Sequence, residues 1–97
     1  MFGKRHHDNE LEVPSSVAKN SAAVEVLRVW APPGQPQQFV LRTTWKNPAA
    51  WGLLLVDVAR QAASAYAAEG HDREAVILKI RELWDAEFAN PTDSPEG

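Results

Sequence analysis

A proline-rich run near the middle of the chain constrains its fold more than any other feature. Residues 32–36 read Pro-Pro-Gly-Gln-Pro and must form a turn or loop, because proline lacks a backbone N–H and glycine favours turn conformations. A segment rich in β-branched and aromatic residues stands on each side of it, at 24–30 and 39–45. Such segments favour strands. The pattern therefore predicts an antiparallel β-hairpin.

The register of this hairpin decides which side chains share a face. We take Ala31 to lie opposite Gln38. Trp30 then faces Phe39, which is a favourable aromatic pair across the strands. Alternation also places Arg28 on this more apolar face. Neither face of the predicted hairpin is cleanly polar.

Arg28 needs a partner on such a face, since an unpaired buried charge is costly. One interpretation is structural: Arg28 pairs with Asp57, Glu87 or another acid, or the register lies one step away. The other is functional: Arg28 anchors an anion or small molecule in a cleft with aromatic walls. The residues that would form this cleft are Arg28, Trp30, Arg42 and Trp45.

Two helices are predicted after the hairpin. Asn47 and Pro48 mark the start of the first, because Asn caps free N–H groups and Pro suits the first helical position. Gly70 ends this helix, Asp72 caps the second, and residues 90–91 end it. The inner apolar positions are Trp51, Leu54, Leu55, Val58, Ala59, Ala62, Ala65 and Tyr66, then Val76, Ile77, Ile80, Leu83, Trp84 and Phe88.

The order of these elements predicts an α+β fold. A two-stranded antiparallel β-hairpin is followed by, and packs on, an antiparallel pair of helices. We place this single domain at 13–91, with one helical turn at 13–20, a flexible N-terminal arm at 1–12 and a flexible tail at 92–97. Because two strands alone make a marginal sheet, the hairpins of two copies could combine into a four-stranded sheet.

Composition narrows the class of protein. The net charge of −3 argues against nucleic-acid binding, and the absence of cysteine excludes disulfides and thiolate sites. No apolar run is longer than that at Leu53–Val56, which is far too short to span a membrane. No secretory signal is apparent. We therefore expect a cytoplasmic protein that binds neither nucleic acid nor membrane.

Catalytic and metal sites are not expected. His6 and His7 fall in the predicted arm and His71 in the link between the helices, away from the predicted core. The serines lack a nucleophile motif. His6, His7 and Asp8 adjoin one another, but a metal site needs ligands that converge from ordered segments. We expect no enzyme activity, no metal and no cofactor.

Apolar surface is in surplus along the chain. Both faces of the hairpin are partly apolar, and Leu53 and Leu78 stand on otherwise polar sides of the helices. The four tryptophans are best explained as core residues. One small chain cannot easily cover all of this surface, which predicts a homodimer unless the N-terminal segment folds over the second face. The expected interface residues are Leu27, Val29, Val40, Leu53 and Leu78.

Four blocks of sequence carry a family resemblance: residues 25–30, 47–55, 57–60 and 84–92. They resemble a small bacterial family classed as a domain of unknown function, DUF5076, over about residues 12–92. The resemblance implies a stand-alone protein of this length and brings no activity, cofactor or catalytic residue with it.

Two functional hypotheses remain. The first is a small non-catalytic interaction or adaptor protein that acts as a homodimer, with a protein partner that the sequence does not identify. The second is a small-molecule or anion-binding module that uses the predicted cleft of arginine and tryptophan side chains.

Overall fold

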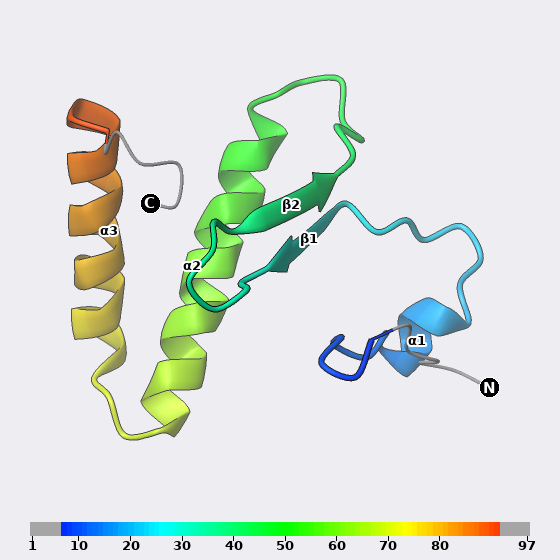
Figure 1. Cartoon of the computed structure of the whole chain (residues 1–97), viewed down its shortest axis with the longest axis horizontal. Coiled ribbons are helices and arrows are strands. Elements are labelled where there is room, and N and C mark those ends of the chain that lie inside the picture. Colours follow the sequence, from blue (N-terminus) through cyan, green and yellow to red (C-terminus); the bar gives the residue numbers. More distant parts are fainter. Residues whose placement is uncertain (1–6, 92–97) are drawn as a thin grey trace.

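The computed structural model describes residues 7–91. Its elements are α1 (Ser15–Ala18), β1 (Leu27–Trp30), β2 (Gln38–Leu41), α2 (Ala50–Ala68) and α3 (Arg73–Ala89). β1 and β2 form an antiparallel hairpin, and α2 and α3 run antiparallel beside each other (Figure 1). The predicted α+β fold is therefore confirmed, as is a helical turn within 13–20. Residues 1–6 of the predicted arm, with His6, and the predicted tail at 92–97 lie outside the described residues.

The loop between the strands follows from its prolines and glycine. The N–H of Gln35 donates to the carbonyl of Pro32 at 3.2 Å, which closes a turn with Pro33 and Gly34 at its centre. Gly34 has a φ of 70°, a left-handed value that glycine adopts without a steric penalty. Proline before such a glycine is typical of a type II turn.

The strand register differs from the expected one by one residue. Trp30 lies opposite Gln38, and Phe39 lies opposite Val29, so the predicted pairing of Trp30 with Phe39 is wrong. A shift of one residue exchanges the two faces of one strand relative to the other. The turn at residues 32–35 follows from its sequence, but those residues alone do not determine which residues of the two strands lie opposite each other.

Each face of the hairpin can now be defined by its residues. The Leu27 face carries Leu27, Val29, Phe39 and Leu41, and the Arg28 face carries Arg28, Trp30, Gln38 and Val40. The first face is entirely apolar. The second holds the only charged side chain within these two strands, that of Arg28.

β2 ends earlier than expected, because the chain turns sharply after it. Thr44 has a φ of 61°, which is strained for a β-branched residue. The N–H of Trp45 donates to the carbonyl of Thr43 across this turn. The indole Nε1 of Trp51 donates to the same carbonyl at 3.2 Å, and the Trp45 and Trp51 rings meet edge to face at 5.7 Å. These contacts join the end of the hairpin to the first turn of α2.

Gly70 and Asp72 act at the helix ends as predicted, whereas α2 begins at Ala50, later than predicted, and no side chain caps it. Asn47 accepts a hydrogen bond from the N–H of Ala49 at 3.0 Å, just before α2. Gly70 has a φ of 105° and ends α2 together with the bond from the N–H of His71 to the carbonyl of Tyr66. Asp72 accepts from the N–H of Ala75 at 3.2 Å and so caps α3.

The described part of the chain forms no closed core by itself. Ala63 on α2 is its only fully buried residue. Within residues 7–91, no Cα atom of the strands lies within 8 Å of one in α2 or α3. The expected packing of the hairpin on its own helices is therefore loose at best, and the predicted inner residues Leu83, Trp84 and Phe88 of α3 stay exposed.

The dimensions of the chain agree with this open packing. Its radius of gyration is 15.9 Å, whereas a compact domain of this length has about 12.5 Å. It exposes 8475 Å², whereas a compact chain of 10.7 kDa exposes about 5,500 Å². If residues 1–6 and 92–97 are counted at the full surface of an unfolded chain, about 1,900 Å², about 6,600 Å² remains for residues 7–91. A compact chain with the mass of residues 7–91 exposes about 5,000 Å², so an excess of roughly 1,500 Å² is left.

Candidate functional site

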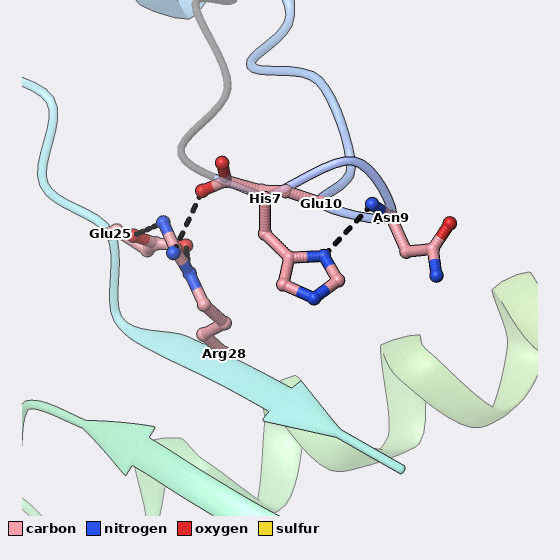
Figure 2. Close-up of polar contacts among 5 residues, drawn as sticks. All are labelled: His7, Asn9, Glu10, Glu25 and Arg28. Atoms are coloured by element: carbon pink, nitrogen blue, oxygen red, sulfur yellow. Dashed lines mark hydrogen bonds and ion pairs between the residues drawn. The ribbon is translucent and has the colours of Figure 1, made fainter. Parts of the chain in front are cut away.

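Arg28 is held by two carboxylates on the side of β1 that faces the N-terminal segment, residues 7–24. Its Nε and Nη2 donate to the two oxygens of Glu25, at 3.1 and 2.9 Å, in a two-point contact that suits a planar guanidinium. Its Nη1 lies 2.8 Å from Oε2 of Glu10. Figure 2 shows Arg28 reaching from β1 to both acids. Arg28 thus joins two segments that are far apart in the sequence.

The electrostatics of this cluster favour the charged guanidinium. The hydrogen bond to Glu25 contributes most to a raised pKa of Arg28; desolvation opposes it, and the charges of Glu25 and Glu10 add to the rise, so the net direction is upward. The Arg28 side chain is 36% exposed and that of Glu10 only 11%. Two carboxylates already surround the cation, so its charge is balanced without any added anion.

A second contact holds the N-terminal segment to the same face. The rings of His7 and Trp30 lie 5.0 Å apart, and His7 Nδ1 accepts a hydrogen bond from the N–H of Asn9 at 3.0 Å. Figure 2 shows His7 beside the Arg28 cluster. Residues 7–12 therefore contact β1, although their predicted flexibility stays a prediction. The N-terminal segment therefore covers part of the Arg28 face.

An open cavity of about 520 Å³ lies between the N-terminal segment and β1. Arg28 and Trp30 line it, together with Glu10, Glu25 and apolar side chains such as Leu11. Such a volume suits a small ligand. The structure brings two of the four predicted cleft residues together here, and the cavity has more apolar than charged lining.

The other two predicted cleft residues lie elsewhere. Arg42 follows β2, where its N–H donates to the carbonyl of Val26 at 3.0 Å, and its side chain does not line the cavity. Trp45 packs against Trp51 at the start of α2. Neither residue joins Arg28, so the predicted four-residue cleft divides into the cavity and the junction between hairpin and helix.

The predicted interface residues are spread over both faces of the hairpin and over both long helices. Leu27 and Val29 share the Leu27 face, whereas Val40 lies on the Arg28 face. Leu53 on α2 and Leu78 on α3 are 73% and 57% exposed. All five are apolar side chains at or near the surface of a single chain.

A second apolar surface runs along the outer part of α3. Ile80, Leu83, Trp84 and Phe88 line an open groove of about 530 Å³, bordered by Lys79 and Glu87. The Trp84 and Phe88 rings lie 5.1 Å apart. The spacing of these residues predicted an inner stripe, and the structure shows that within one chain this stripe is not covered.

Potential metal ligands are dispersed over residues 7–91. No group of three or more His, Asp or Glu side chains there could hold a metal ion. None of the helices in this part of the chain has the length and apolar character to cross a bilayer. His71 contacts the Tyr66 ring at 5.2 Å, and Ser64 accepts a hydrogen bond from Arg73 at 3.1 Å.

Sequence reasoning missed the partners of Arg28 and Trp30. Glu25 is three residues from Arg28 in an extended segment, where no helical spacing indicates a pair. Glu10 and His7 stand in the segment expected to be a loose arm. No periodic signal connects that segment to β1, and only the folded chain reveals the contact.

Comparison with known proteins identifies the family. Residues 10–92 match the family described as Domain of unknown function (DUF5076). The chain belongs to this family. A DUF5076 assignment confirms the resemblance carried by the four sequence blocks, and it comes with no assigned activity. A search of curated proteins found no match.

A solved structure shares the fold of this DUF5076 chain. It is described as "a putative pyruvate dehydrogenase from the photosynthetic bacterium Rhodopseudomonas palustrus", and it is 33% identical. The match covers 93% of each chain with a TM-score of 0.74. The arrangement of hairpin and helices is therefore shared between this chain and the solved structure over almost the whole length of both.

Proposed function

We propose that this protein works as a homodimer and serves as a small non-catalytic interaction protein. The observation that carries the proposal is the surface excess of roughly 1,500–3,000 Å² over a compact chain of this mass. Obligate dimers bury about 1,000–2,500 Å² on each partner. The excess of one chain therefore matches what a second copy would cover.

The character of the excess surface supports the same proposal. Exposed apolar side chains form the Leu27 face and the α3 groove, and exposed aliphatic residues extend along α2. Soluble monomers rarely leave contiguous apolar patches of this extent open to water. Two copies would cover these surfaces while leaving the charged sides of the helices available to a protein partner.

Light scattering tests the dimer directly. Across about 1–100 µM protein, the expected mass is twice the 10.7 kDa of the chain. The thermal midpoint should rise with concentration, because dissociation accompanies unfolding of an obligate dimer. A strict monomer at tens of micromolar, with a midpoint that does not depend on concentration, contradicts the proposal.

The non-catalytic half of the proposal needs its own experiment. The enzyme name of the solved relative suggests pyruvate as the substrate to test. Purified protein should not reduce an artificial electron acceptor in the presence of pyruvate, with or without added thiamine diphosphate and magnesium. Reproducible turnover that co-purifies with the chain contradicts a non-catalytic role.

The cavity beside Arg28 favours a second candidate function, the binding of a small molecule. Arg28 is already paired with Glu10 and Glu25, so a partly apolar, uncharged ligand suits the site better than a free anion. A thermal-shift screen of metabolites tests it, because a ligand of the native state raises the midpoint. A shift that Trp30→Ala abolishes supports this function, and a screen without any shift contradicts it.

A further inference from the structure

We propose that the dimer forms by antiparallel pairing of β2 with β2 of a second copy, which joins the two hairpins into a four-stranded sheet. This inference rests on the proposed homodimer and specifies its geometry. The decisive observation is the direction of the backbone groups along β2. The outward backbone groups of β2 form an unpaired edge that can bond to β2 of a second copy.

The hydrogen-bond pattern of the hairpin fixes this direction. The N–H of Arg42 donates to the carbonyl of Val26, so this pair is a hydrogen-bonded one. Bonded and non-bonded pairs alternate along an antiparallel ladder. The Arg28–Val40 pair is then bonded, whereas Leu27–Leu41 and Val29–Phe39 are not. The backbone groups of Phe39 and Leu41 consequently point away from β1.

Apart from its shortness, β2 lacks the features that usually protect an edge strand. Its sequence, Gln-Phe-Val-Leu, contains no charged residue and no proline. Every residue of β2 is exposed, with Phe39 at 58% and Leu41 at 53%. Edge strands normally carry charges, prolines or bulges that prevent pairing with another chain. An unprotected edge of this kind is suited to a specific partner strand.

β1 is a poorer candidate for the partner strand. Its residues are mostly half-buried, and the N-terminal segment is held against it through Glu10 and His7. β2 leads from the hairpin loop to the turn at Thr44 and has no such cover among the described residues. Because β2 is more exposed than β1, we place the contact between the two copies at β2.

Two-fold symmetry then restricts the register between the copies. Outward-pointing residues must pair with outward-pointing residues, so Phe39 pairs with Leu41 of the partner and Val40 lies on the symmetry axis. This register makes the fullest use of the short strand. It also merges the two Leu27 faces into one apolar sheet surface. The two Val40 Cα atoms would lie about 4.5 Å apart, as in other non-bonded antiparallel pairs.

A single engineered cysteine tests this register. The chain contains no cysteine, so Val40→Cys introduces the only thiol. A separation of about 4.5 Å lies within the range that a disulfide spans. Mild oxidation should convert Val40→Cys into a covalent dimer at least about tenfold faster than Gln61→Cys, an exposed control on α2. Circular dichroism before oxidation shows whether both variants keep the fold.

Amide hydrogen exchange tests the same pairing without a substitution. The N–H groups of Phe39 and Leu41 point outward, so an isolated hairpin would leave them unprotected. In the paired sheet they should exchange about tenfold or more slowly, approaching the protection of Val40. Fast exchange of both amides alongside a protected Val40 overturns the inference.

The outcomes separate this inference from the proposed function. If light scattering shows a dimer while Val40→Cys cross-links no faster than Gln61→Cys and both outward amides exchange fast, the dimer stands and the β2 contact is wrong. If light scattering shows a monomer, both proposals fail. Rapid cross-linking of Val40→Cys together with slow amide exchange supports both.

Discussion

The helical hairpin and the β-hairpin of this protein differ in what determines their structure. α2 and α3 contact each other, and their ends are set by residues within one turn of each terminus. β1 and β2 contact only each other among the described elements, and the segment that covers one of their faces lies far away in the sequence. The helices therefore depend on local rules, whereas the hairpin depends on distant partners.

The largest effect that tests this difference is expected at Ala63, the fully buried residue of α2. Ala63→Leu adds a branched side chain where no space exists and should lower the free energy of unfolding by about 1–3 kcal/mol. Ala68→Leu makes the same change at an exposed position of α2 and should have little effect. Chemical denaturation measures both. Equal free energies of unfolding for the two variants would show that α2 and α3 do not depend on the packing around Ala63.

An intermediate effect is expected from a pair of glycine substitutions. Gly70→Ala forces an alanine into a φ of 105° and should cost about 1–2 kcal/mol. Gly52→Ala lies within α2 with open space around the added methyl group and should stabilise the protein by about 0.5–1 kcal/mol. Thermal denaturation should show a lower midpoint for Gly70→Ala and a higher midpoint for Gly52→Ala. This result would support the view that local rules govern the helices. Two changes of the same sign contradict it.

The smallest effect on overall stability is expected at Glu10. Glu10→Gln removes one of the two charges on Arg28 but keeps the shape of the side chain. Because Glu25 still pairs with Arg28 and the cation is partly exposed, the free energy of unfolding should change little. Amide exchange in residues 7–18 should nevertheless become faster, while exchange in α2 stays unchanged. Unchanged exchange in residues 7–18 would mean that the N-terminal segment is held by other contacts.

The same contrast explains what the sequence could predict. Asp72 and Gly70 were identifiable because capping requires particular residues at particular places, and both act as expected. The register was not identifiable, because the loop between the strands allows more than one alignment, and a shift of one residue exchanges the faces. The interpretation of Arg28 as paired with an acid, which remained open, agrees with its contacts to Glu25 and Glu10.

The candidate site was predicted only in part. Arg28 and Trp30 line one cavity as expected, because alternate residues of a strand share a face. Arg42 and Trp45 do not, since β2 ends at Leu41 and the turn that follows redirects the chain. The apolar stripe of α3 was also predictable from its spacing. Its exposure was not, because periodicity indicates which side chains avoid water but not which molecule covers them.

The turn at Thr44 has a mechanical consequence for the molecule. A β-branched residue keeps a left-handed φ only where its surroundings hold it there. Here the indole of Trp51 supplies that restraint through its bond to the Thr43 carbonyl. Trp45 supports the same turn through its N–H and its ring, so the junction between hairpin and helices rests on these two tryptophans. We therefore expect a substitution of Trp51 to change the orientation of the β-hairpin relative to the helices, and with it the position of both hairpin faces.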